Sequence, residues 1–197
     1  LIFQLLADGK SKASDASLVK QIIEKARTKH GLTSAEVAIL LQVENQELIK
    51  KMFSTAAEIK EAIYGKRIVL FAPLYISSYC VNNCVYCGYC ASNDKQLRRR
   101  LSMEDVAQEV KILESLGHKR LAVEAGEDPI NCPIEYVTDV LKQIYSLKFD
   151  NGSIRRANVN IAATTIEDYA KLKAAGIGTY ILFQETYHRE TYARLHP

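Results

Sequence analysis

Residues 68–90 read IVLFAPLYISSYCVNNCVYCGYC, an apolar run followed at once by four cysteines within eleven residues. The apolar part, residues 68–76, has the length and composition of a buried β-strand. Thiols at Cys80, Cys84 and Cys87 follow it with spacings of four and three. In parallel β/α folds, ligand chemistry gathers at the carboxyl ends of the strands. The stretch therefore predicts a strand with a metal-binding loop at its end.

Apolar runs and helical patterns alternate after this loop. Strands are expected at residues 121–124, 157–162 and 179–183, and helices at 103–116, 133–147 and 166–175. This alternation predicts an α/β fold with four parallel strands joined by right-handed crossovers. Because a closed barrel needs eight such units, two architectures remain. The region is either a small open sheet or the first half of a (β/α) barrel that continues beyond residue 197.

Residues 14–65 show helical periodicity without strand-like runs. Thr33-Ser34-Ala35-Glu36 forms a capping box for the second of three expected helices. Gly31 and Gly65 are expected to end the first and the third. We therefore expect an all-helical extension over residues 1–66 and the β/α region over 67–197. The chain begins without methionine and ends on Leu195-His196-Pro197, which suggests a truncated piece of a longer protein.

Composition excludes several classes of protein. The 197 residues are 48% hydrophobic and 25% charged, which is typical of a globular protein. A net charge of +3 indicates neither a nucleic-acid partner nor an anionic membrane surface. The apolar runs are far shorter than the ~20 residues of a membrane helix. Without a signal-peptide pattern we expect a cytoplasmic protein, where clustered thiols more often hold metal than form disulfides.

The cysteine cluster has two interpretations. Three thiolates can hold a [4Fe-4S] cluster and leave one iron open to a small molecule. The alternative is a zinc module with four ligands, in which Cys90 joins the other three. Zinc sites usually use two separated C-x2-C pairs, whereas these cysteines share one short loop. The cluster is therefore favoured, with Cys90 as a nearby thiol that is not a ligand.

The pattern C-x3-C-x2-C, with Tyr86 before its last cysteine, resembles the radical S-adenosylmethionine (SAM) superfamily. The strings CVNNCVYCGY, RRRLS, LGHKRLAVEAGEDP, NGSIRRANVN and FQETYHRETYARLHP are similar to the tyrosine lyases of [FeFe]-hydrogenase maturation. The 2-iminoacetate synthases of thiazole biosynthesis share the loop and a similar QETYH segment, and they remain the alternative. The resemblance covers residues 68–197 and implies a partial (β/α) barrel of the radical SAM type.

The resemblance also implies roles for particular residues. The iron ligands of a bound cluster would be Cys80, Cys84 and Cys87. In bound SAM, Tyr86 would contact the adenine, Gly126 and Glu127 the amino group, and Glu185 the ribose. Simpler explanations exist, because Glu127 could start a turn and Glu185 could cap a helix. Asn158 and Asn160 share one face of a strand, and Asn160 is a cofactor contact if that face lines the barrel.

Gln184 and His188 are candidate catalytic residues, because a histidine can move a phenolic or amine proton near neutral pH. His188 could equally be a helix residue bonded to a neighbour. The basic run at residues 95–100 is interpreted as a solvated surface, and Cys132 as a structural thiol.

The implied activity is reductive cleavage of SAM to methionine and a 5′-deoxyadenosyl radical. The radical would then cleave L-tyrosine to p-cresol and dehydroglycine, the source of carbon monoxide and cyanide. The partners implied are an electron donor such as a ferredoxin or flavodoxin, and other hydrogenase maturation proteins. The chain stops before the family's second-cluster domain and the arginine segment for the SAM carboxylate, so we expect it to be incomplete for the whole reaction.

Overall fold

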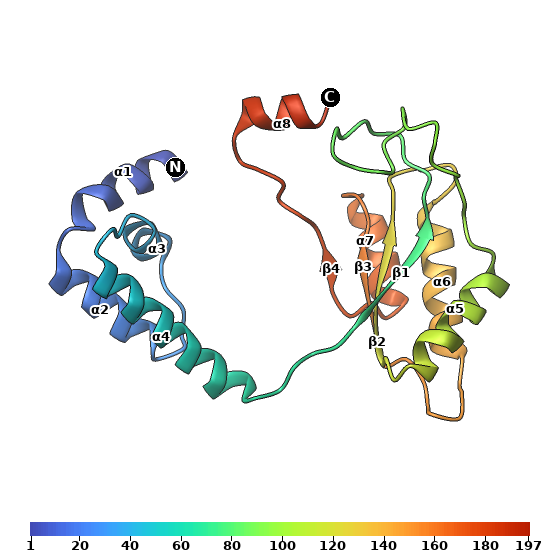
Figure 1. The fold of residues 1–197 in the computed structure, drawn as a ribbon, viewed down its shortest axis with the longest axis horizontal. Coiled ribbons are helices and arrows are strands. Elements are labelled where there is room, and N and C mark those ends of the chain that lie inside the picture. Colours follow the sequence, from blue (N-terminus) through green and yellow to red (C-terminus); the bar gives the residue numbers. More distant parts are fainter. The chain divides into compact units, whose positions relative to one another are not determined.

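A computed structural model describes residues 1–197, which form two compact units, Leu1–Ile68 and Val69–Pro197 (Figure 1). Across these residues, no helix combines the length and apolar composition that a membrane crossing requires. The elements in chain order are α1 (Ile2–Lys12), α2 (Ala16–Ala26), α3 (Ser34–Leu40), α4 (Gln46–Tyr64), β1 (Ala72–Ser77), α5 (Met103–Ser115), β2 (Arg120–Ala125), α6 (Ile134–Ser146), β3 (Arg156–Asn160), α7 (Ile166–Ala174), β4 (Tyr180–Ile181) and α8 (Arg189–Leu195).

The first unit consists of helices α1–α4 around a small apolar core. The predicted capping box is present, with Thr33 and Glu36 bonding each other's backbone amides. Helix α4 ends at Gly65, whose φ of 62° suits glycine. Helix α2 ends at Ala26, so the prediction that Gly31 terminates it is wrong. Lys29 makes the turn instead, at a φ of 63°.

Helix α1 is absent from the sequence-based prediction because its first apolar residues give no buried stripe. Leu1, Ile2 and Phe3 are exposed. Helix α1 packs on α3 at Gly9, where an added Cβ would lie 2.7 Å from the Ala38 carbonyl oxygen. Only glycine permits this approach of the two helices.

The second unit is a parallel sheet in the order β1-β2-β3-β4, which confirms the α/β class and its four strands. Leu74, Val123 and Val159 are paired across the sheet and are buried. Helices α5, α6 and α7 lie along one side of it (Figure 1). The core of this unit combines these strand residues with apolar side chains of the three helices. Helix α5 also begins with a capping box, formed by Ser102 and Asp105.

Two strands are shorter than the apolar runs suggest. Strand β1 begins at Ala72 rather than residue 68, because its pairing with β2 starts at the Ala72–Leu121 pair. Strand β4 covers two residues instead of residues 179–183, because it pairs only with Val159 and Asn160.

The face of the sheet opposite the helices is polar near its carboxyl edge. Tyr75, Glu124 and Asn160 are paired across β1, β2 and β3 on this face. Asn158 lies on the same face two residues earlier. Both asparagines therefore point away from the crossover helices, and Asn160 stands where the strands end.

Candidate functional site

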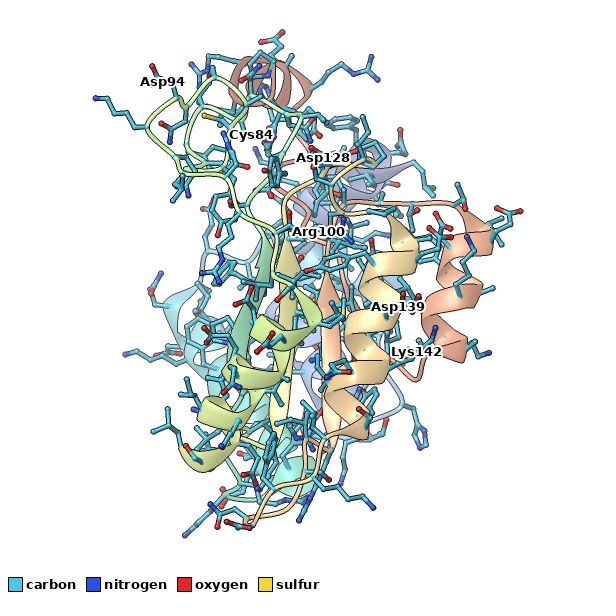
Figure 2. All side chains as sticks on the ribbon, turned by 90° about the vertical axis from the view of Figure 1, so that its right-hand side faces the viewer. Cys84, Asp94, Arg100, Asp128, Asp139 and Lys142 are labelled. Atoms are coloured by element: carbon cyan, nitrogen blue, oxygen red, sulfur yellow. The ribbon has the colours of Figure 1, made fainter.

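The four clustered cysteines lie on a long loop after β1. Its ends are joined where the Ser78 amide donates to the Arg99 carbonyl at 2.9 Å. Within it, the Asn82 carbonyl accepts from Ala91 at 2.7 Å, and the Asn83 side chain accepts from Ser92 at 2.8 Å. These bonds fold the loop back on itself, which gathers its thiols at the carboxyl end of the sheet. Figure 2 shows Cys84 in this loop, at the same end of the sheet as Asp128.

The Arg98 side chain binds backbone carbonyls of the loop. Its guanidinium donates to the carbonyl oxygens of Ser78 at 2.6 Å, Tyr89 at 2.8 Å and Cys90 at 2.5 Å. Arg99 pairs with Asp105 at the exposed surface instead. The interpretation of residues 95–100 as a solvated surface is therefore wrong for Arg98, since sequence alone cannot show which arginine turns inward.

The Cys84 thiol is surrounded by polar and aromatic groups. Its Sγ lies 3.3 Å from Nδ1 of His196, and Nε2 of the same ring lies 3.2 Å from the Tyr86 hydroxyl. Partial burial, followed by the neighbouring thiols of Cys87 and Cys80, raises the pKa of Cys84. Three thiols on one short loop form a soft donor set, which fits an iron–sulfur cluster.

All five cysteines are free thiols. The Cys90 Sγ lies 3.7 Å from the Ser92 hydroxyl. Cys132 packs against the core of the second unit, and burial raises its pKa to about 11. No three Cys, His, Asp or Glu side chains in residues 1–197 are arranged as the ligands of a single metal ion would be.

Gly126 and Glu127 join the end of β2 to the cysteine loop. A Cβ on Gly126 would overlap the Tyr79 carbonyl oxygen and lie 2.8 Å from the Cys80 Cβ. The Glu127 carbonyl accepts from the Val81 amide at 2.8 Å, and its carboxylate accepts from the Asn82 side chain at 2.6 Å. The motif therefore fixes the loop from the neighbouring strand.

The turn after β2 depends on Asp128 rather than Glu127. The Asp128 carboxylate accepts from the amides of Ile130 and Asn131 and from the Asn131 side chain, at 2.8 to 2.9 Å. The simpler explanation of Glu127 as a turn residue is therefore wrong. Its carboxylate faces the loop.

A cavity of about 240 Å³ collects several of the predicted site residues. Its lining includes Cys80, Gly126, Glu127, Asn160 and Glu185. A larger cavity of about 350 Å³ shares Gly126, Glu127, Ile161 and Ala162 with it and is otherwise lined by α6, α7 and the loops before them. We assign the site to the smaller cavity because it brings loop, strand ends and acidic groups together.

Glu124 is a site residue that the sequence analysis missed. It lines the same cavity and accepts a hydrogen bond from Asn160 at 2.5 Å. Burial raises its pKa, and the bond from Asn160 opposes that rise. The sequence does show a carboxylate inside an apolar strand. Its hydrogen-bond partner, Asn160, can be identified only from the register of the two strands.

The candidate catalytic residues lie outside this cavity. His188 caps α8, with Nδ1 2.9 Å from the Thr191 hydroxyl and 3.3 Å from its amide. The Gln184 side chain donates to the Thr186 carbonyl at 3.1 Å. Glu185 lines the cavity and does not cap the helix, because His188 does.

The chain matches the Radical SAM superfamily over residues 74–197, from β1 through α8. It belongs to that superfamily. Members of this superfamily use a [4Fe-4S] cluster and SAM, which agrees with the thiol loop and the acidic cavity beside it.

Solved structures and curated relatives give the finer comparison. The crystal structure of HydG, a maturase of the [FeFe]-hydrogenase, is 61% identical with a TM-score of 0.91, and the match covers 100% of this chain and 43% of that one. HydG from Carboxydothermus hydrogenoformans is 38% identical, with a TM-score of 0.78 over 99% of this chain and 46% of that one. The 2-iminoacetate synthase of Escherichia coli (strain K12) is 28% identical over 88% of this chain and 44% of its own length. The chain therefore spans less than half the length of these relatives.

Proposed function

We propose that the chain is the N-terminal half of a radical SAM carbon–carbon lyase that cleaves L-tyrosine in [FeFe]-hydrogenase cofactor maturation. The observation that carries this proposal is the 61% identity to HydG over the whole chain. The thiazole-pathway alternative has weaker support, because the 2-iminoacetate synthase relative is only 28% identical. A structural zinc module would leave Glu185, which lines the cavity beside the loop, without a role.

Cys80, Cys84 and Cys87 would hold the [4Fe-4S] cluster, which when bound supplies the electron that splits SAM. The Glu127 carboxylate lines the cavity beside Cys80, where it can pair with the SAM ammonium. Glu185 lines the same cavity and can accept bonds from the ribose hydroxyls. Asn160 and Gly126 complete its polar wall, and Tyr86 on the loop can lie against the adenine.

L-tyrosine would be cleaved between Cα and Cβ to p-cresol and dehydroglycine, which leads to carbon monoxide and cyanide. His188 and Gln184 remain our candidates for contacting it. Because Nδ1 of His188 is engaged by Thr191, Nε2 is the ring atom that can exchange a proton with substrate. The electron donor would be a ferredoxin or flavodoxin, and the products would pass to other maturation proteins. Since this chemistry needs a strong cellular reductant and SAM, we place the protein in the cytoplasm.

The test uses the full-length protein that contains this chain, reconstituted anaerobically with iron and sulfide. We expect a brown protein that forms p-cresol from tyrosine only when SAM and reductant are present, together with carbon monoxide and cyanide. Cys84→Ala is the matched control and should form none. Formation of p-cresol without diatomic products would favour the thiazole-pathway activity. A colourless protein that retains zinc would contradict both.

A further inference from the structure

His196 connects α8 to the cysteine loop through contacts on both ring nitrogens. Its Nδ1 lies 3.3 Å from Cys84 Sγ, and its Nε2 lies 3.2 Å from the Tyr86 hydroxyl. The ring stacks on Tyr192, with centroids 4.4 Å apart and planes 14° apart. The Val85 amide also donates to the Leu195 carbonyl at 3.0 Å. The histidine is therefore held by stacking and by backbone docking, and not only by its polar contacts.

These contacts select one tautomer when Cys84 is a thiolate. A thiolate ligand can only accept a hydrogen bond, so Nδ1 must carry the proton. The Tyr86 phenol carries one hydrogen on its oxygen, which lies 3.2 Å from Nε2. The phenol can therefore donate to the unprotonated Nε2. Both bonds are satisfied together by a neutral ring.

We propose that His196 is a positioning residue that donates from Nδ1 to the Cys84 thiolate and accepts the Tyr86 hydroxyl at Nε2. This inference rests on the proposed function, because it requires the cluster on Cys84. A hydrogen bond to a ligand sulfur withdraws charge from it and raises the reduction potential of an iron–sulfur cluster. The bond between Nε2 and the Tyr86 hydroxyl fixes the Tyr86 ring, which we place against the adenine. One residue would thus couple the ease of cluster reduction to SAM placement.

Two variants separate the two bonds in the full-length, cluster-loaded protein. The amide nitrogen of His196→Asn occupies the place of Nδ1, whereas the amide of His196→Gln reaches the place of Nε2. We expect His196→Gln to lower the ratio of reduced to oxidised cluster about tenfold at a fixed potential, which equals about 59 mV for one electron. His196→Asn should keep the wild-type potential but bind SAM several-fold more weakly. Arg194→Ala, on the exposed side of α8, is the control and should change neither quantity.

The readouts are iron content, the midpoint potential from a redox titration followed by electron paramagnetic resonance, and the SAM dissociation constant. Equal midpoint potentials in the Asn and Gln variants would overturn the inference, as would loss of iron from both. Loss of iron from His196→Gln alone would support it, because only that variant lacks the donor to Cys84. A wild-type protein that binds no cluster would instead overturn the proposed function.

Discussion

Gly126 lies where the end of the second strand packs against the start of the cysteine loop. A Cβ there would overlap the Tyr79 carbonyl oxygen, which belongs to the backbone and cannot move aside without displacing Cys80. We expect Gly126→Ala to lower the free energy of unfolding by about 1 to 3 kcal/mol, the usual cost of overpacking. It should also reduce iron uptake. Gly88→Ala is the matched control, since an added Cβ there meets nothing within 4 Å. Equal denaturant midpoints for the two variants would contradict the packing argument.

The cluster-ligand assignment is tested by comparing the loop cysteines with one another. Replacing Cys80, Cys84 or Cys87 with alanine should abolish the cluster, because two thiolates cannot hold three of its irons. Cys90→Ala should retain most of the iron, since its thiol is placed beside Ser92. Iron analysis after anaerobic reconstitution measures this. A Cys90→Ala protein as poor in iron as Cys84→Ala would make all four cysteines ligands.

Glu127 is expected to bind SAM through its charge. Glu127→Gln keeps the size of the side chain and its contact to Asn82 but removes the charge. SAM affinity should therefore fall about ten- to a hundredfold, because a charge-assisted hydrogen bond contributes roughly 1.5 to 3 kcal/mol. Glu185→Ala should weaken binding less if it meets only neutral hydroxyls. Glu135→Gln removes a charge that pairs with Lys171 outside this cavity, and it should leave affinity unchanged. Isothermal titration of the cluster-loaded, full-length protein decides the matter, and unchanged constants in both site variants would end the assignment.

The loop after β1 behaves as an element whose shape depends on Arg98. Arg98→Ala would leave the carbonyls of Ser78, Tyr89 and Cys90 without their shared donor. We expect it to lower the free energy of unfolding by about 2 to 4 kcal/mol, and to make the loop an early site of proteolysis. Arg99→Ala loses only an exposed pair with Asp105 and should cost about 0 to 1 kcal/mol. Limited proteolysis and denaturant melts measure these effects. Equal cleavage of the two variants would contradict the prediction.

The elements themselves were largely predictable from sequence, because local signals specify them. The capping boxes at Thr33 and Ser102 and the alternation of strands with helices are both visible in short windows. Strand lengths were not predictable, since β1 and β4 extend only as far as a partner strand runs beside them. The contact of His196 with Tyr86 joins residues 110 positions apart, so no window could reveal it. Resemblance supplied the site residues, and the register showed which of them share a face.

At the scale of the whole molecule, the sheet has unsatisfied borders. Strands β1 and β4 each have a single neighbouring strand in the order β1-β2-β3-β4. The chain after β4 leaves Leu182 and Phe183 59% and 67% exposed. The face opposite the helices carries Glu124 and Asn160, which are only partly buried. An apolar border beside a polar, half-open face is what the first half of a barrel would present to its second half.

Residues 1–197 expressed alone should therefore self-associate. An open strand edge with exposed apolar side chains pairs readily with another chain, and no other strand of this chain pairs with the free edge of β4. We expect size-exclusion chromatography with light scattering to show oligomers or aggregates, and poor solubility compared with the full-length protein. Leu182→Lys with Phe183→Lys should restore a smaller species by placing charge at the edge. Leu97→Lys, on a still more exposed apolar residue away from that edge, should not. A monodisperse wild-type monomer with a cooperative melt would mean that four β/α units form a self-sufficient sheet, and the half-barrel interpretation would then be wrong.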